Sequence, residues 1–260
     1  MFSMLRNWLN ERIIRKSTIS NDQWLEVFSH LPLLDRLTAG EKGKLRRLAI
    51  LLLHKKSFEG VQGHHLTEEM KISIALQACL PILYLGIEWY RGWVSIIVYP
   101  DSFVPQSTYT DESGVVHNSK KVLGGEAWLR GPVILSWEGV ASSAPLDGSN
   151  LVIHEFVHKL DMLNGVANGF PPLHAGMVSQ SWADNFSRAF EDLQARIHAG
   201  ESTVIDGYAA TSPAEFFAVL SEVFFERPEQ IDSVYPQVYQ HLADFFRQDP
   251  LSGQAGTGLK

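Results

Sequence analysis

The sequence predicts an α+β protein in which a small mixed β-sheet lies beside several helices. Apolar residues recur at helical spacing in the first third of the chain, and β-branched and aromatic residues gather between positions 93 and 137. Helical spacing returns from position 150 onward. We therefore expect a mainly helical part at 1–92 and a core with the sheet at 93–250, which form one compact unit, followed by a flexible tail at 251–260.

The first part of the chain is expected to contain four helices. The segment Met1–Lys16 mixes four basic residues with apolar ones, and it lacks the apolar run and the cleavage site of a signal peptide. We favour an ordinary helix packed on the domain over an amphipathic helix at a membrane surface, because only four basic residues are involved. A short helix is expected at 21–30, another opens at the capping-box sequence Thr38–Glu41, and a further one runs from Thr67 to Pro81.

Three strands are expected in the middle of the chain. The first, at 93–99, is rich in β-branched and aromatic residues and stops at Pro100. The segments 115–117 and 132–137 have the same character, and glycine-containing turns separate them. These strands make the small sheet.

Four helices are expected after position 150. The first covers 151–163 and is closed by an Asn-Gly pair, and the second covers 179–199 and is closed by a glycine. The third is capped by Ser212, has a proline in its first turn and ends near 226–228. A last helix occupies about 235–248.

The composition limits the classes of partner and compartment. The formal net charge of −7 argues against nucleic acid as a direct partner, since phosphate binding needs a basic face. The single cysteine, Cys79, excludes an intrachain disulfide and a metal site of several cysteines, and it favours a reducing compartment. No apolar stretch approaches the length of a membrane span. We therefore expect a cytoplasmic protein with no membrane span.

One sequence pattern, formed by His154, Glu155 and His158, indicates a metal site. Residues four apart lie on one face of a helix, so the two histidines can both offer an imidazole nitrogen to one ion. Glu155 lies one step round the helix, where it can accept a proton from water without being a ligand. Two imidazoles and a carboxylate suit zinc. The alternative is a buried helix whose two histidines merely reach solvent, but apolar flanking residues favour a metal site in a low-dielectric cleft.

A catalytic zinc site needs a third protein ligand, and the sequence offers three candidate carboxylates. Asp161, on the same face one turn after His158, is better placed to orient a ligating imidazole. Glu215 and Glu222 share a face of a later helix, and either could point at the metal. Ser212 and Glu215 also form a capping box, in which the glutamate only reaches back to its own helix start. The spacing alone leaves Glu215 open between ligand and cap.

Two stretches of the chain resemble a known family. The stretch 208–218 (Tyr-Ala-Ala-Thr-Ser-Pro-Ala-Glu-Phe-Phe-Ala), which follows His-Glu-Phe-Val-His-Lys-Leu-Asp at 154–161, resembles the Mlc titration factor A family of bacterial cytosolic proteins. This resemblance covers nearly the whole chain and includes 83–89, 116–118 and 249–251. The region from about 150 to 226 is also similar to the catalytic domain of anthrax lethal factor, a gluzincin.

The resemblance implies a zincin-like fold, in which a helix carrying His-Glu-x-x-His lies beside a small mixed sheet and a helical C-terminal part. It implies a zinc metallopeptidase of the gluzincin type, with aminopeptidase activity as one form of that reaction. It also assigns roles to individual residues: zinc ligands at His154, His158 and Glu215, a general base at Glu155, a phenol that steadies the developing oxyanion at Tyr208, and a supporting carboxylate at Asp161.

The chain departs from this pattern at one position. Lethal factor has a second glutamate one turn after its ligand glutamate, where this chain has Val219. Support of the third ligand would therefore fall to Glu222.

The resemblance further implies a protein partner, the glucose repressor Mlc, whose binding would regulate sugar-uptake genes. Two other functions stay open at this point. One is a non-catalytic regulator that sequesters the repressor and has a slow or conditional zinc site, and the other is a zinc amidase or deacylase of non-peptide bonds. Glu155 discriminates against the first, because a pure binding protein has no need of a proton acceptor there.

Overall fold

The computed structural model describes residues 2–101, 131–143 and 146–252, together with the backbone of three strands at 107–110, 116–119 and 125–127. The helices in this part of the chain are α1 (Phe2–Arg15), α2 (Asn21–Ser29), α3 (Ala39–Lys55), α4 (Glu68–Cys79), α5 (Trp137–Ser142), α6 (Leu151–Asp161), α7 (Ser179–His198), α8 (Pro213–Glu226), α9 (Pro228–Val234) and α10 (Pro236–Phe246). The strands are β1 (Ser57–Gly60), β2 (Ser95–Tyr99), β3 (Ser107–Thr110), β4 (Val116–Ser119), β5 (Gly125–Ala127) and β6 (Val133–Ser136).

The small mixed sheet that the sequence predicts is present, and the fold is α+β. Its strand order is β1–β2–β6–β5. Strands β1, β2 and β6 run parallel, and β5 pairs antiparallel with β6 at one edge. The strand expected at 115–117 is present as β4, but it does not join this sheet, because it pairs with β3 in a separate antiparallel pair. Helix α3 packs against β1, while α6, which carries the His-Glu-x-x-His pattern, packs against β5 and β6 and so lies directly on the sheet.

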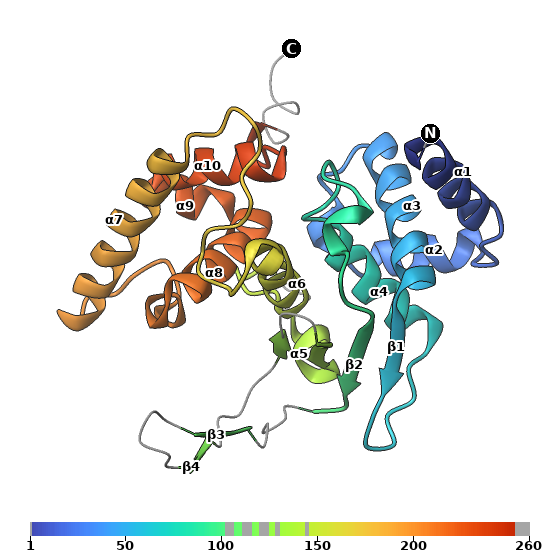
Figure 1. The fold of residues 1–260 in the computed structure, drawn as a ribbon, viewed down its shortest axis with the longest axis horizontal. Coiled ribbons are helices and arrows are strands. Elements are labelled where there is room, and N and C mark those ends of the chain that lie inside the picture. The colour runs from blue at the N-terminus through green and yellow to red at the C-terminus, as the bar shows by residue number, and fades with distance from the viewer. Residues whose placement is uncertain are drawn as a thin grey trace.

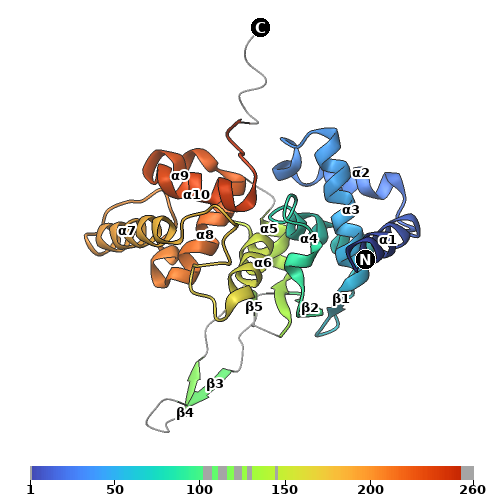
Figure 2. The same cartoon turned by 45° about the horizontal axis from the view of Figure 1, so that its top comes forward.

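The helices form two groups on either side of α6. Figures 1 and 2 place α1–α4 at one end of the molecule and α7–α10 at the other, with α6 between them. Strand β1 precedes the boundary expected at 92–93 and β2 follows it, so the sheet joins chain from both sides. That boundary remains a proposal about chain organisation. Of the tail expected at 251–260, positions 253–260 lie outside the described residues.

Among the described helices and strands, β1, β3, β5, α5 and α9 escape the sequence-based prediction, and the reasons are clear for β1 and α9. Strand β1 is a four-residue segment, Ser-Phe-Glu-Gly, that alternates between exposed and half-buried positions and therefore lacks the apolar signal of its neighbours. Helix α9 begins at Pro228, which the sequence marks only as the end of the preceding helix. Proline has the φ angle of a first helical turn and needs no N–H partner there, so Pro228 both ends α8 and opens α9.

The predicted helix starts follow ordinary capping chemistry. Thr38 and Glu41 form the expected capping box at α3, and the Thr67 hydroxyl accepts from the Met70 N–H at the start of α4. Ser212 caps α8 in the same way. These local bonds fix where the helices begin.

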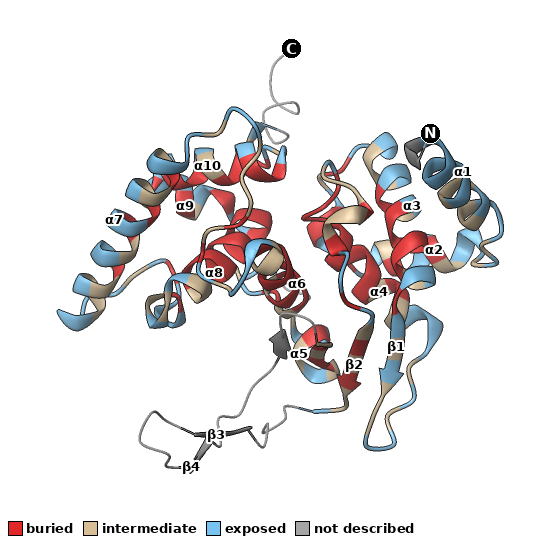
Figure 3. Ribbon diagram, in the orientation of Figure 1, coloured by how far each residue is buried: buried red, intermediate tan, exposed pale blue. Residues whose placement is uncertain are grey.

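The apolar core continues through both helical groups, as the buried positions in Figure 3 show. Phe156 on the inner side of α6 packs against Tyr90 and Trp93, with ring centroids 5.2 and 5.6 Å away. In the C-terminal helical group, Trp182 of α7 stacks on Phe186 at 4.2 Å and contacts Phe217 of α8 at 5.9 Å. These aromatic contacts hold α6 and α8 in fixed positions. No helix in the described part of the chain is both long and apolar enough to cross a membrane.

Candidate metal centre

Helix α6 presents the two histidines of the motif on one face. The side chain of Asn150 caps the helix by accepting from the Ile153 N–H at 3.0 Å. One turn apart, His154 and His158 place their Nε2 atoms 3.2 Å from each other, with ring centroids 4.8 Å apart. Two basic nitrogens that converge in this way leave room for a shared cation.

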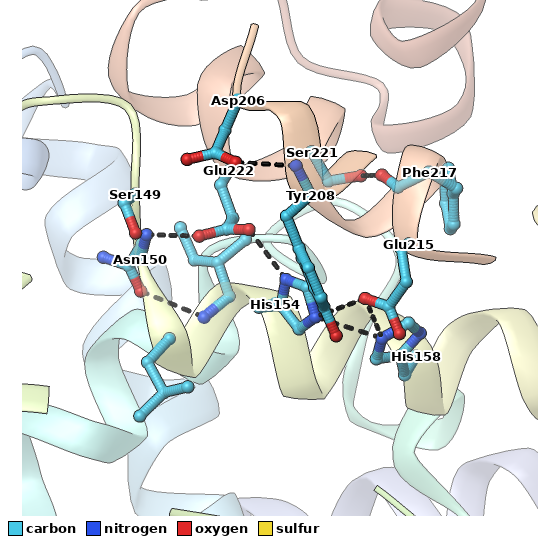
Figure 4. Close-up of polar contacts among 12 residues, drawn as sticks. Ser149, Asn150, His154, His158, Asp206, Tyr208, Glu215, Phe217, Ser221 and Glu222 are labelled. Carbon is cyan, nitrogen blue, oxygen red and sulfur yellow. Dashed lines mark hydrogen bonds and ion pairs between the residues drawn. The ribbon is translucent and has the colours of Figure 1, made fainter. Parts of the chain in front are cut away.

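Helix α8 brings a carboxylate to the same point. Glu215 Oε2 lies 3.0 Å from His154 Nε2 and 3.5 Å from His158 Nε2 (Figure 4). The Ser212 hydroxyl still caps α8 by accepting from the Glu215 N–H at 3.2 Å, while the carboxylate of Glu215 turns toward the histidines. Burial alone would raise the pKa of Glu215, but the two histidines hold that pKa well below its ordinary value. The carboxylate is therefore a charged neighbour of both imidazoles.

The three facing atoms fit a tetrahedral metal site. Zinc bonds to nitrogen and oxygen of about 2.0–2.1 Å place two tetrahedral ligand atoms about 3.3 Å apart. The observed separations among the two Nε2 atoms and Glu215 Oε2 are 3.0, 3.2 and 3.5 Å. Within the described part of the chain, these three residues form the one group of His, Cys, Asp or Glu side chains found close enough together to hold an ion.

Glu222 holds the imidazole of His154 from the outer side. Its Oε1 lies 2.7 Å from His154 Nδ1, and its Oε2 accepts from the Asn150 N–H at 2.5 Å. A proton on Nδ1, donated to this carboxylate, leaves the Nε2 lone pair free for a cation. Glu222 thus supports a histidine rather than Glu215, and it ties α8 to the start of α6.

Asp161, which the charge of His158 also affects, bonds to the loop that follows α6. Its Oδ2 accepts from the Asn168 and Gly169 N–H groups, both at 2.8 Å, and the side chain is fully buried. Gly169 has a φ angle of +75°, and a Cβ there would lie 2.4 Å from the Pro213 carbonyl oxygen. Asp161 therefore secures the loop on which the first turn of α8 rests, and this loop brings Glu215 toward α6.

Glu155 is buried beside the cluster without belonging to it. It is 3% exposed, and its Oε2 has no hydrogen-bond partner among the described residues. Burial raises the pKa of Glu155 to about 7, although the neighbouring His154 and His158 act to lower it. Its carboxylate oxygen is free to accept a proton.

Tyr208 comes from the short 3₁₀ turn at Gly207–Thr211, which Asp206 caps by accepting from the Tyr208 N–H at 2.7 Å. In Figure 4 its ring reaches down past His154 toward Glu215, and the ring centroids of Tyr208 and His154 are 6.1 Å apart. Burial and the nearby carboxylates of Glu215 and Glu155 raise the pKa of Tyr208 to about 12. The phenol therefore keeps its proton at neutral pH.

A buried polar network behind the site was not expected from the sequence. Asn150 Nδ2 donates to Gln77 Oε1 at 2.9 Å and to Glu226 Oε1 at 3.1 Å, and Glu226 Oε2 accepts from the Gly148 N–H at 3.0 Å. The available signals were an asparagine at the position before the motif helix and a glutamate one turn after Glu222. Neither signal identifies its partner, because the partners come from α4, from α8 and from the segment before α6.

Comparisons with known proteins agree with this site. A family model described as glucose-regulated metallo-peptidase M90 matches residues 5–247. Proteins called Mlc titration factor A from Yersinia pestis and Yersinia pseudotuberculosis are each 41% identical over 233 residues, which cover 88% of this chain and 86% of theirs. The resemblance to the Mlc titration factor A family is thereby confirmed. The chain belongs to the glucose-regulated metallo-peptidase M90 family, to which a site able to hold a metal ion is suited.

Proposed function

We propose that this protein is a zinc-dependent metallopeptidase of the gluzincin type, with His154, His158 and Glu215 as the zinc ligands. The observation that carries the proposal is the approach of Glu215 Oε2 to the Nε2 atoms of both histidines. Zinc suits two imidazoles and a carboxylate, and when bound it would polarise the scissile carbonyl and activate water near neutral pH.

Glu155 is the residue that we propose moves the proton. It neighbours His154 in sequence, its carboxylate is buried, and its Oε2 has no partner among the described residues. This oxygen can accept the proton of the attacking water and deliver it to the leaving amine as the peptide bond breaks. The polar groups that contact His154 and Glu215 keep these two side chains in place during both proton transfers.

Tyr208 is the residue that we propose steadies the reacting carbonyl. Its hydroxyl is protonated at neutral pH and its ring lies beside His154, so it can donate to the carbonyl oxygen as that oxygen gains charge. Glu222 supports the same step indirectly, because it holds His154 in the tautomer whose Nε2 faces Glu215.

Metal analysis and peptide hydrolysis test the proposal together. The purified protein should carry close to one zinc per chain, and His158→Ala should lose most of it. Glu155→Gln should retain the zinc, because Glu155 is not a ligand, yet it should lose peptide cleavage. Cleavage by Glu155→Gln at the unmutated rate would exclude this reaction at this site and leave the non-catalytic regulator as the better function. Chelator-insensitive cleavage by the unmutated protein would exclude the zinc mechanism.

The aminopeptidase form of the reaction rests on the family resemblance and has its own test. A peptide library digested with and without prior acetylation of its α-amino groups separates the two cases. An aminopeptidase should cleave the free peptides and spare the acetylated ones, whereas equal cleavage of both would assign an endopeptidase. We propose a cytoplasmic site of action, in keeping with the single cysteine.

We also propose that the protein binds a repressor of the Mlc type and so regulates sugar-uptake genes. The support is the name of its Yersinia relatives, Mlc titration factor A, together with their 41% identity to this chain. A pull-down with purified Mlc should capture the unmutated protein and Glu155→Gln equally, since this substitution leaves the surface unchanged. Failure of both to bind would remove the repressor from the proposal without affecting the peptidase.

A further inference from the structure

One face of α1 is apolar in its first half and basic in its second half. With 100° of rotation per residue, a single arc of about 140° carries seven residues and no acidic one. We call this face the α1 stripe, and its members are Met4, Leu5, Trp8, Leu9, Arg12, Arg15 and Lys16. Lys16 still belongs to it, because its N–H bonds to the Arg12 carbonyl oxygen.

The stripe points into solvent. Its apolar members Met4, Leu5, Trp8 and Leu9 are 77%, 56%, 56% and 44% exposed, and the basic members are exposed as well. The guanidinium of Arg12 lies 5.7 Å from the centroid of the Trp8 ring, which places the junction of the two halves on one surface. Exposing four large apolar side chains on one helix face to water is energetically unfavourable, and it is unusual for a surface that contacts only water.

The opposite face of α1 packs on the protein. Ile13 and Ile14 are half-buried against the core, and Glu11 pairs with Arg47 of α3. The helix is therefore anchored by its far side while the stripe faces outward. In the described part of the chain, Arg12, Arg15 and Lys16 form no ion pair with an acidic side chain.

The charge of the chain is divided along its length. The first 60 residues hold 11 Lys and Arg against 6 Asp and Glu, a net charge of +5, while the rest of the chain carries −12. Although the overall charge is −7, the N-terminal part of the chain, which includes the stripe, is basic. A basic end on an acidic protein is attracted to an anionic surface in one orientation.

We propose that the α1 stripe docks the protein on an anionic phospholipid surface, with the apolar half among the headgroups and the basic half against lipid phosphates. Nucleic acid would use the basic half but would leave four apolar side chains in water. A bilayer interface accepts both halves, and tryptophan and arginine are both suited to its depth. The protein would thus bind the membrane peripherally, at the bilayer surface.

The geometry leaves the candidate metal centre accessible during docking. In Figures 1 and 2, α1 lies at one end of the molecule, whereas α6 and α8 lie at its centre and beyond. Docking would thus hold the protein at the membrane with α6 and α8 turned away from the lipid. The inference does not depend on the peptidase proposal, because no residue of the metal centre takes part.

Vesicle co-flotation of the full chain tests the inference. The protein should float with phosphatidylcholine vesicles that contain phosphatidylglycerol, remain unbound with phosphatidylcholine alone, and be released as salt is raised. Each basic residue near such a surface contributes about fivefold to partitioning, so Arg12→Gln/Arg15→Gln/Lys16→Gln should bind on the order of a hundredfold more weakly. Leu5→Gln/Trp8→Gln tests the apolar half and should also bind more weakly.

A matched control comes from the other end of the molecule. Arg188→Gln/Val178→Gln removes one exposed basic and one exposed apolar side chain at α7, and it should float like the unmutated protein. Melting temperatures of all variants should agree, because the altered side chains are exposed.

Several results would overturn the inference. Equal binding to neutral and anionic vesicles would remove the role of the basic half, and wild-type binding by the triple variant would remove the role of the stripe. Binding to duplex DNA that requires the stripe, without flotation on either vesicle, would assign the stripe to nucleic acid instead.

Discussion

The sequence position of Glu215 allows two roles, that of a helix cap and that of a metal ligand, and the two differ in the direction of the carboxylate. The sequence Ser212-Pro-Ala-Glu215 fits a helix cap as well as a ligand, and local spacing cannot separate these functions because both leave the backbone unchanged. In the folded chain, the Ser212 hydroxyl accepts from the Glu215 N–H at the start of α8, and the carboxylate of Glu215 turns to the two histidines. That direction is set by the packing of α8 against α6, which no local pattern encodes.

Glu215→Gln should remove metal binding while it leaves the melting temperature of the metal-free protein nearly unchanged. The backbone N–H at 215 keeps its bond to Ser212, and an amide oxygen is a poor zinc ligand. Metal content and thermal melting of the chelated protein measure the two effects. Glu222→Gln is the comparison, because it disturbs His154 without removing a ligand and should weaken metal affinity by about 10–100-fold. Full metal in Glu215→Gln beside none in Glu222→Gln would show that the ligand carboxylate is Glu222.

Tyr208→Phe should lower kcat by about a hundredfold with little change in KM. The phenol hydroxyl acts mainly when the carbonyl oxygen gains charge, so its loss affects the transition state more than substrate binding. Steady-state peptide hydrolysis measures both constants. Tyr84→Phe is a suitable control, since Tyr84 is similarly exposed and donates to Glu41 at 2.7 Å, far along the chain from the site. Equal losses in both variants, or a rise in KM alone, would contradict the proposed role of Tyr208.

At the scale of elements, α6 and α8 are joined by buried polar groups as well as by apolar packing. Glu222 receives the Asn150 N–H and faces His154, while Glu226 one turn later receives the Asn150 side chain. Asn150 is thus both the cap of the motif helix and the meeting point of two glutamates from α8. Such groups are costly to bury unless each finds its partner, so the network fixes one relative position of the two helices.

Glu226 should make the stability of the protein depend on pH. Burial, together with the charges of Asp147 and Glu222, raises the pKa of Glu226 to about 7, although the bonds from Asn150 and Gly148 act to lower it. A carboxyl whose pKa is raised on folding contributes stability that is present below its unfolded pKa and lost as pH rises through its folded pKa. A shift from about 4.5 to about 7 corresponds to a loss on the order of 3 kcal/mol between pH 5 and 8.

Glu226→Gln tests this dependence. The difference in the free energy of unfolding between the variant and the unmutated protein, both metal-free, should change by about that amount between pH 5 and 8, in favour of the variant at high pH. Denaturant unfolding across this range measures it. Glu229→Gln on the outside of α9 is the control and should show a constant difference. A constant difference for Glu226→Gln as well would mean that Glu226 has the same pKa in the folded and in the unfolded protein.

At the scale of the whole molecule, the sequence predicts what local chemistry determines. The capping box at Thr38, the cap at Ser212 and the face shared by His154 and His158 are all set within one or two helical turns, and each is present in the structure. Strand β1 could not be predicted, because a four-residue half-exposed segment becomes a strand only when β2 pairs with it. The loop from Asp161 to Gly169 likewise acquires its role only once Pro213 lies against it.

Helices α6 and α8 should depend on the metal for part of their mutual stability. The proposed ligands come from α6 and α8, so an ion bound to His154, His158 and Glu215 stabilises the folded chain by mass action and is lost on unfolding. A chelator should therefore lower the melting temperature of the unmutated protein by several degrees, since a ligand at about a hundred times its Kd contributes about 2.7 kcal/mol. His158→Ala should melt at one temperature with and without chelator, whereas Glu155→Gln should respond like the unmutated protein because Glu155 holds no metal. Chelator sensitivity that persists in His158→Ala and disappears in Glu155→Gln would exchange the roles of ligand and base, and it would require a different geometry from the one in which Glu215 faces both histidines.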